Sequence, residues 1–284
     1  MKIIECPRDA MQGLHDFIPT EKKALYINQL LKVGFDTIDF GSFVSPKAIP
    51  QLKDTAQVLD QLDLTRTKSK LLAIIANLRG AEDAIQFEEI DYLGFPLSIS
   101  EQFQKRNTNK SIADALITVA DIQNLCQKNN KTLVTYISMG FGNPYGEAFN
   151  EEIVAGFVEK LATLGVKIIS LSDTIGVAAP EVINSIFRTS INAYPSIEFG
   201  AHFHSTPDKT LEKLEVAYKA GCRRFDTAIK GFGGCPMAKD DLTGNVATER
   251  LISFLSSIKQ ETGLDKDAFD QAMLMSLDVF PQNG

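Results

Sequence analysis

The amino-acid sequence predicts an α/β protein that folds as a single-domain (β/α)8 barrel, the TIM-barrel class, over residues 1–284. Short apolar runs alternate strictly with helical patterns, which favours a parallel sheet with right-handed crossovers. The alternation occurs eight times, the number of units that closes such a sheet into a barrel. Residues 31–38, 162–169 and 218–225 also share a local pattern, in which a helix ends at a glycine and a strand follows.

Eight apolar runs supply the expected strands. In chain order they cover residues 2–5, 35–40, 71–76, 92–95, 132–138, 167–171, the run from 197 that carries two histidines, and 224–229. An open, doubly wound sheet is the alternative. The glycine fingerprint that such folds carry after their first strand is replaced here by Pro7-Arg8-Asp9, so the barrel is favoured.

A helical pattern follows each strand. The first helix is expected to have Thr20 as its N-cap and to end at Gly34, and a longer one runs from Ser111 to about Lys128. The others are expected from about residue 54, after 79, at 153–164, from 180, at 211–218 and from about 245. Two polar stretches, residues 6–13 and 100–110, are interpreted as loops after the first and fourth strands.

The composition excludes several classes of protein. Hydrophobic residues make up 44% and charged residues 23%, as in ordinary globular domains, and no apolar run is long enough to suggest a membrane-spanning helix. The net charge of −7 argues against general nucleic-acid binding. The N-terminus carries no secretory or transit pattern, so we expect a cytoplasmic protein. The four cysteines lack C-x-x-C spacing and are expected to be free thiols.

Two of the three histidines, His202 and His204, lie at the end of the seventh expected strand. Side chains two residues apart in a strand point to the same face, so two imidazoles stand side by side there. A metal ion accounts for such a pair. The alternative is that one or both histidines are satisfied core or N-cap residues.

The expected barrel brings further ligands to this pair. Active-site residues of such barrels lie at the C-terminal ends of the strands, and closure makes strands seven, eight and one neighbours. Asp9 follows the first strand, so Asp9, His202 and His204 form a set of one carboxylate and two imidazoles, with Asn245 as a further carbonyl ligand. This mixture favours Mg²⁺ or Mn²⁺, with Zn²⁺ less favoured, and leaves open positions for substrate.

Six motifs occur in order between residue 3 and about residue 255. They are Pro7-Arg8-Asp9-x-x-Gln12, Ser42-Phe43-Val44-Ser45-Pro46-Lys47, Asp173-Thr174-Ile175-Gly176-Val177, His202-x-His204, Gly233-Gly234-Cys235-Pro236 and the segment 244–249. Together they resemble 3-hydroxy-3-methylglutaryl-CoA lyases, which belong to the metal-dependent TIM-barrel superfamily of lyases and acyl-CoA condensing enzymes. The ordered series is far more specific than any single motif.

The resemblance implies a retro-Claisen cleavage of an acyl-CoA substrate to acetyl-CoA and acetoacetate. Asp9, His202, His204 and Asn245 would hold the metal. Arg8 would face the thioester carbonyl and stabilise the enolate, because a guanidinium stays charged and donates a fork of hydrogen bonds.

Other residues would handle protons and substrate. The resemblance implies that Cys235 acts as acid or base, that Asp39 orients Arg8 or the metal shell, and that Asp173 positions or deprotonates the substrate hydroxyl. The base itself is left open between Asp173, a metal-bound water and a histidine. The expected substrate-binding residues are Gln12, Ser42 and Thr174.

Structural alternatives accompany these roles. Arg8 with Asp9 is alternatively a surface ion pair, Asp173 and Asn245 helix caps, and Cys235 a buried small hydrophobe. Three basic residues are expected on solvated surface rather than at CoA phosphates, namely Lys47, Lys105 and Arg106.

Several departures from the family pattern leave the acyl group open. They are Val134 for an arginine, Asp39 for a glutamate, Met139 and Asn143 for cysteines, and a segment between Cys235 and Asn245 that is one residue longer. Two further enzymatic functions therefore stay open, an acyl-CoA condensing enzyme and an aldolase. A catalytically silent metal-binding barrel is the alternative of another class. A homodimer is expected because dimers are the commonest soluble assembly.

Overall fold

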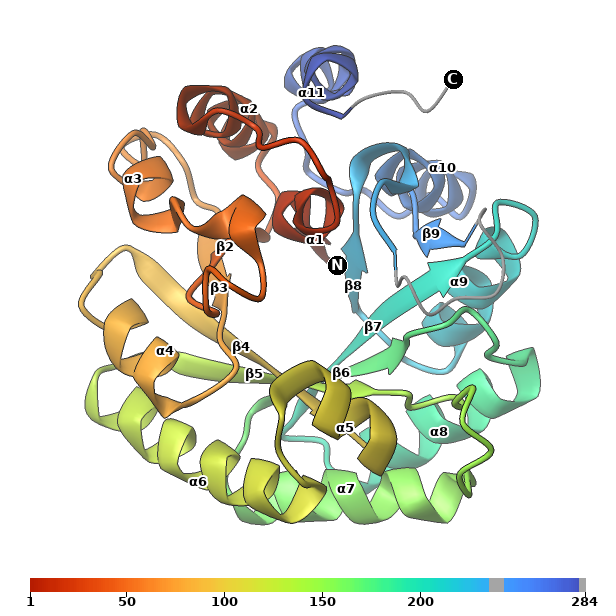
Figure 1. Cartoon of the computed structure of the whole chain (residues 1–284). Helices are drawn as coiled ribbons and strands as arrows, with labels where there is room; N and C mark the ends of the chain where they lie inside the picture. The colour runs from red at the N-terminus through yellow and green to blue at the C-terminus, as the bar shows by residue number, and fades with distance from the viewer. Residues whose placement is uncertain (235–242, 281–284) are drawn as a thin grey trace.

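The computed structural model describes residues 1–234 and 243–280, which form a closed barrel of parallel strands surrounded by helices (Figure 1). The barrel strands are β1 (Lys2–Glu5), β2 (Thr37–Ser42), β3 (Lys70–Ile74), β4 (Ile90–Ser98), β5 (Thr132–Ser138), β6 (Ile168–Asp173), β7 (Glu198–Ser205) and β8 (Arg224–Thr227). Each strand pairs in parallel with the next, and β8 pairs with β1, which closes the barrel. The predicted fold class is confirmed.

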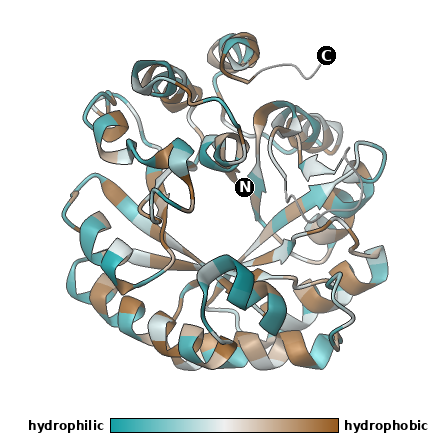
Figure 2. Cartoon of the chain, viewed as in Figure 1, coloured by the Kyte–Doolittle hydropathy of each residue, from teal (hydrophilic) through white to brown (hydrophobic). Residues whose placement is uncertain are grey.

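The helices are α1 (Pro7–Gln12), α2 (Thr20–Val33), α3 (Thr55–Leu59), α4 (Leu78–Ala84), α5 (Glu101–Thr108), α6 (Ile112–Lys128), α7 (Glu151–Thr163), α8 (Pro180–Ala193), α9 (Thr210–Lys219), α10 (Thr248–Ser257) and α11 (Lys266–Val279), with the 3₁₀ helices η1 (Pro50–Leu52) and η2 (Ile229–Gly231). Most of them surround the sheet on its outer side, whereas the short α1 and α5 lie at the end of the barrel (Figure 1). Figure 2 shows apolar and polar patches alternating along helices such as α6. Its buried residues recur every three or four positions, as expected of a helix with one face on the sheet.

Two segments interpreted as loops are helical instead. Residues 7–12 form α1, where Pro7 occupies the first turn and has the backbone angle that a helix start requires. Residues 101–108 form α5, because the Ser100 hydroxyl accepts the Phe103 N–H at 3.1 Å and caps the first turn. Both predictions were wrong because helices of six and eight residues, about two turns each, leave too little apolar periodicity to recognise.

Two predicted helix starts also differ from the structure. Thr20 is the first residue of α2 and not its N-cap, since its hydroxyl donates to Asp54 at 2.8 Å. The helix expected from about Asn245 begins at Thr248. Gly244–Asn245 instead forms a short strand, β9, which pairs antiparallel with β7 and sets Asn245 opposite His204.

The interior of the barrel is divided into an apolar and a polar side. Leu72, Ile74, Tyr92, Val134, Tyr136 and Ile168 form an apolar cluster inside β3–β6. Ser170 of β6 and Arg224 and Asp226 of β8 are instead polar inner residues, and all three are buried. A larger apolar layer fills the space between sheet and helices. The fold therefore directs its buried polar chemistry to the β6–β8 side of the barrel.

Two predictions from composition can be checked in the described part of the chain. None of its helices is long and apolar enough to cross a membrane. Cys6, Cys126 and Cys222 are buried free thiols, as predicted. Cys235 lies outside the described residues.

Candidate active site

Asp9, His202 and His204 converge at the C-terminal ends of the strands. Each offers one ligand atom, and these atoms lie within 4.8 Å of one another. The two histidines are neighbours on one face of β7, with ring centroids 5.4 Å apart, and Asp9 comes from α1, directly after β1. Since β8 pairs with both β7 and β1, the carboxylate lies within coordination reach of the imidazoles, as the sequence predicted.

The ring of His204 is fixed in one tautomer. Its Nδ1 lies 2.8 Å from the backbone oxygen of Thr174, and a carbonyl can only accept, so Nδ1 carries the hydrogen. The other nitrogen, Nε2, is buried and has no hydrogen-bond partner among the described residues. Burial, with the nearby charge of His202, lowers the pKa of His204 to about 4 and keeps the ring neutral at pH 7. A buried, unpartnered lone pair beside a carboxylate fits a divalent metal ion.

His202 makes a different contact through the same ring atom. Its Nδ1 lies 3.2 Å from Oδ2 of Asp226 on β8, and its ring packs edge-on against Tyr136. Burial lowers the pKa of His202, but the hydrogen bond and charge of Asp226 outweigh it, and the net shift is upward. Asp226 was not predicted from the sequence. The sequence did offer one sign of it, because an acidic residue stands in an otherwise buried strand at a position whose side chain points into the barrel.

Asp9 is held by three donors. Arg8 Nη1 donates to its Oδ1 at 3.0 Å, Gln12 Nε2 donates to the same oxygen at 2.8 Å, and Asn245 Nδ2 donates to Oδ2 at 2.8 Å. Burial raises the pKa of Asp9, but the charges of Arg8 and the two histidines outweigh it and lower the pKa to about 2. The carboxylate is therefore ionised at neutral pH, as a metal ligand must be.

Arg8 forms a two-pronged ion pair with Asp39. Its Nε lies 3.1 and 3.0 Å from the two oxygens of Asp39, and Nη1 also donates to Gln12 at 2.9 Å. Burial raises the pKa of Asp39 to about 6 against the opposing charge of Arg8. Asp39 was expected to orient either Arg8 or the metal shell. Its hydrogen bonds are to Arg8.

Asn245 reaches the site from β9. Its Nδ2 donates both to Asp9 and to the backbone oxygen of Phe232, at 2.9 Å in the latter case. Neither bond uses the amide oxygen Oδ1. A Cβ atom on Gly233 would lie 2.9 Å from this Nδ2 and 2.9 Å from the Asp9 backbone oxygen, so only glycine fits so close to both residues.

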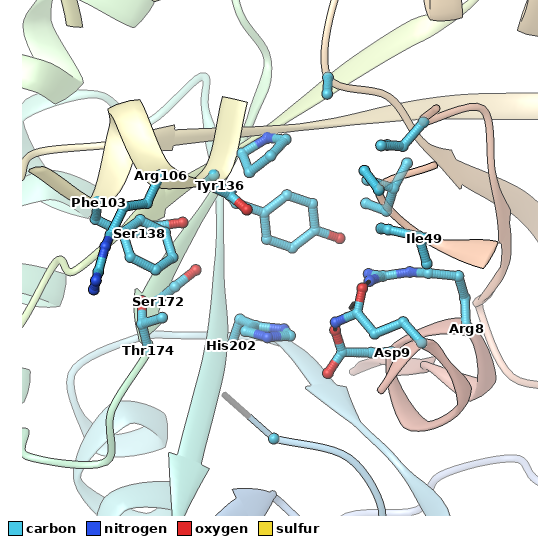
Figure 3. A pocket seen from close by; sticks show the side chains of 18 of the residues that line it. Arg8, Asp9, Ile49, Phe103, Arg106, Tyr136, Ser138, Ser172, Thr174 and His202 are labelled. Carbon is cyan, nitrogen blue, oxygen red and sulfur yellow. Dashed lines mark hydrogen bonds and ion pairs between the residues drawn. The ribbon is translucent and has the colours of Figure 1, made fainter. Parts of the chain in front are cut away.

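A cavity of about 380 Å³ opens over these side chains (Figure 3). Arg8 and Asp9 lie on one side of it, Phe103, Ser138 and Arg106 lie on the other, and His202 lies between the two groups. Its remaining wall includes the apolar residues Val44, Ala48, Ile49, Ile74, Ala76 and Pro96. Arg106 is exposed, as the sequence predicted, and also lines the cavity. Its position on α5 could not be foreseen once that segment was interpreted as a loop.

Only some of the other predicted site residues line this cavity. Gln12 and Thr174 line it, whereas Ser42 does not, and the Ser42 hydroxyl accepts the Val44 N–H at 3.2 Å. Cys235 lies outside the described residues.

Asp173 is buried and absent from the cavity lining. Its carboxylate accepts the N–H groups of Val177 and Ala178 at 2.9 and 3.0 Å and pairs with Lys213 at 2.6 Å. It does not cap α8, which begins at Pro180. Lys213 also donates to the backbone oxygens of Gly176 and His204 at 3.0 and 3.1 Å. These contacts join the ends of β6 and β7 below the imidazoles.

The fold and the site define a class of protein: a (β/α)8 barrel with a carboxylate–imidazole group for a divalent metal at the floor of an active-site cavity. The HMGL-like family model matches residues 2–275, and the chain belongs to this family.

Named relatives agree with the family. The chain is 34% identical over 258 residues to a hydroxymethylglutaryl-CoA lyase of Bacillus subtilis, which covers 91% of this chain and 85% of the relative. It is 32% identical over 266 residues to the 3-hydroxy-3-isohexenylglutaryl-CoA/hydroxymethylglutaryl-CoA lyase of Pseudomonas aeruginosa, covering 94% and 88%. A solved HMG-CoA lyase from Acinetobacter baumannii, in complex with coenzyme A and 3-methylmalate, superposes with a TM-score of 0.89 at 32% identity, covering 98% and 90%.

Proposed function

We propose that the protein is a divalent-metal-dependent carbon–carbon lyase that cleaves 3-hydroxy-3-methylglutaryl-CoA to acetyl-CoA and acetoacetate. One observation carries the proposal: Asp9, His202 and His204 bring their ligand atoms within 4.8 Å of one another, on the floor of a cavity that also contains Arg8. A barrel without catalytic function has no need for a buried metal group and a buried guanidinium in one cavity. The similarity to named hydroxymethylglutaryl-CoA lyases supports the choice of substrate.

The metal, Mg²⁺ or Mn²⁺, would be held by Asp9, His202 and His204, with Asn245 contributing its amide oxygen, which neither hydrogen bond of its amide nitrogen uses. This donor set of two imidazoles and oxygen atoms suits these ions when positions are left for substrate. When bound, the ion supplies a Lewis acid at the substrate oxygens. The neutral state of His204 and the ionised state of Asp9 prepare both side chains for this role.

The reaction removes the proton of the 3-hydroxyl group and breaks the bond between C2 and C3. The bonding electrons move into the thioester, where they form an enolate, and C3 becomes the ketone of acetoacetate. Arg8 is the residue that faces this negative charge. Its guanidinium is already fixed by Asp39, Asp9 and Gln12, so little reorganisation is needed when the enolate forms.

Protonation of the enolate carbon completes acetyl-CoA, and Cys235 is our candidate for that step. Replacement by serine should then lower kcat and leave Mn²⁺ affinity unchanged, and full activity would remove the assignment. Asp173 is better suited to positioning than to accepting the hydroxyl proton, because Lys213 and two backbone N–H groups already occupy its oxygens. A base supplied by the metal shell fits the contacts better, because His202 and His204 each hold a hydrogen on Nδ1 and direct Nε2 to the metal site.

A longer alkyl group at C3 is a second candidate for the acyl chain. The cavity wall includes Val44, Ile49 and Ile74, which offer only apolar side-chain contacts. A relative from Pseudomonas aeruginosa is named for the isohexenyl substrate as well as the methyl one. Comparing kcat/KM for CoA thioesters with methyl and isohexenyl groups at C3 decides between them.

A coupled assay for acetoacetate tests the proposed function. The purified protein should release acetoacetate from 3-hydroxy-3-methylglutaryl-CoA with Mg²⁺ or Mn²⁺ and should stop when EDTA is added. If no product forms, incubation of acetyl-CoA with 2-oxo acids detects the condensing alternative, and simple hydroxy acids without CoA detect the aldolase. Metal binding without turnover in all three assays identifies the silent barrel.

We also propose that residues 1–284 act as one catalytic domain, that the protein works in the cytoplasm and that it forms a homodimer. The continuous barrel and the match to residues 2–275 support the single domain. Light scattering coupled to size exclusion measures the assembly. A mass near 31.2 kDa, that of one chain, would rule out the dimer.

A further inference from the structure

Asp226 lies directly beneath the candidate metal centre. It belongs to β8 and stands opposite His202 of β7 in the strand register. The residue is only 3% exposed, and its Oδ2 lies 3.2 Å from Nδ1 of His202. It therefore reaches the metal centre only through the histidine.

This contact dictates which nitrogen of His202 carries the hydrogen. An ionised carboxylate can only accept, so the contact requires a hydrogen on Nδ1 and leaves Nε2 as the free nitrogen. The backbone oxygen of Thr174 imposes the same tautomer on His204 at 2.8 Å. Nε2 is therefore the nitrogen without a hydrogen in both rings. His204 is held by a backbone carbonyl and His202 by a carboxylate.

Two other polar side chains lie close to Asp226. The Ser170 hydroxyl donates to Oδ2 at 3.2 Å, and Arg224 extends into the same part of the barrel. Burial lowers the pKa of Arg224, but the charge of Asp226 leads the opposing effects and the net shift is upward. A Cβ atom on Gly200 would lie 3.1 Å from Cδ of Arg224 and 3.3 Å from the Ser170 oxygen, so the missing side chain makes room for both.

Stability alone does not account for this arrangement. Buried ion pairs rarely stabilise a fold more than apolar residues of similar volume, because both charges lose their hydration. The opposite side of the same barrel is filled with apolar residues such as Leu72 and Val134. A charged cluster beneath one histidine therefore indicates a role in the chemistry above it.

We propose that Asp226 is a positioning residue for the metal centre, whose Oδ2 accepts the Nδ1–H of His202 and holds Nε2 available for the ion. The inference rests on the metal site of the proposed function and not on the acyl-CoA substrate. A carboxylate in this place fixes the ring and makes the free nitrogen a stronger donor. Loss of such a partner typically lowers metal affinity by about 10- to 100-fold.

The tautomers can be read by ¹⁵N NMR of the histidine-labelled, metal-free protein at about pH 9. The chain has only three histidines, and the third, His15, is exposed, so the spectrum is simple. We expect both His202 and His204 to carry hydrogen on Nδ1, and Asp226→Asn to change only His202. A wild-type His202 with its hydrogen on Nε2 would overturn the proposal, even if the variant failed to fold.

Calorimetric titration with Mn²⁺ supplies the second readout. Asp226→Asn should bind Mn²⁺ about 10- to 100-fold more weakly than the wild type. Asp36→Asn is the matched control, because Asp36 lies 3.9 Å from the far end of Arg224 and does not touch the histidines, so its affinity should stay within about 3-fold of the wild type. Unchanged affinity in Asp226→Asn would also overturn the proposal. A wild type that binds Mn²⁺ but cleaves no thioester would contradict only the proposed function.

Discussion

The amide nitrogen of Asn245 lies 2.8 Å from the carboxylate of Asp9, although 236 positions separate the two residues in the chain. The contact forms because β9 pairs with β7 and because β8 pairs with both β7 and β1. Closure of the barrel thus joins the first rim segment to the last.

Replacement of His204 by alanine should abolish metal binding. The variant removes a buried nitrogen that has no protein partner among the described residues, and no other side chain in that part of the structure completes the group. We expect Mn²⁺ affinity to fall by more than about 100-fold and turnover to fall with it. His15→Ala, at an exposed position, is the control. Retained Mn²⁺ affinity would show that the ion binds elsewhere.

Arg8→Lys should separate chemistry from metal binding. Lysine keeps the positive charge between Asp9 and Asp39 but cannot form the fork that Arg8 makes with Asp39. We expect kcat to fall by about 100-fold or more, while Mn²⁺ affinity changes only a few-fold. Steady-state kinetics and calorimetry measure both, with the exposed Arg66→Lys as control. Wild-type kcat in Arg8→Lys would exclude the enolate role.

Glu5 should make the stability depend on pH. Burial raises the pKa of this carboxyl from 4.5 to about 8, against hydrogen bonds from Thr248 and from the Ile229 N–H. A raised pKa in the folded state means that the protonated group stabilises the protein below pH 4.5 and that this contribution is lost as the pH rises to about 8. The shift corresponds to at most about 5 kcal/mol.

Glu5→Gln removes this loss because glutamine stays neutral. It can still accept from Ile229 and donate to the Thr248 hydroxyl. Urea unfolding between about pH 5 and pH 9 should therefore show the variant gaining stability relative to the wild type as the pH rises, by several kcal/mol. The exposed Glu212→Gln should show no such trend. Parallel curves for wild type and Glu5→Gln would mean that Glu5 is ionised throughout.

Lys213→Met should destabilise the fold. Lys213 and Asp173 form a pair whose side chains are 2% and 1% exposed, and removal of the lysine leaves a buried carboxylate without its counter-charge. We expect a loss of about 3 to 5 kcal/mol in the free energy of unfolding, partly recovered in the double variant with Asp173→Asn. Lys219→Met removes the exposed partner of Glu215 and should cost less than about 1 kcal/mol.

The same set of variants tests the role of Asp173. If Asp173 only joins the ends of β6 and β7, the double variant should keep its KM and lose at most a few-fold in kcat. If Asp173 takes the substrate proton, kcat should fall by about 100-fold or more in a protein that still folds. Circular dichroism checks the fold before the kinetics are compared.

Several features were determined by the sequence alone. The alternation of apolar runs and helical patterns predicted the barrel, because the period of hydrophobic residues reports local structure directly. The two-residue spacing of His202 and His204 predicted that they share a face of β7, and the order of the strands predicted that Asp9 lies beside them. These inferences need only the local geometry of strands and the closure of an eight-stranded sheet.

Only the tertiary structure decided which residues support Asp9, His202 and His204. Asp226 and Lys213 are charged residues within a strand and a helix, and nothing local distinguishes a buried charge with a partner from an exposed one. The antiparallel pairing of Asn245 with His204 likewise depends on where a distant loop returns to the barrel. Local periodicity fixes which way a side chain points, whereas its partner is fixed by the packing of segments far apart in the chain.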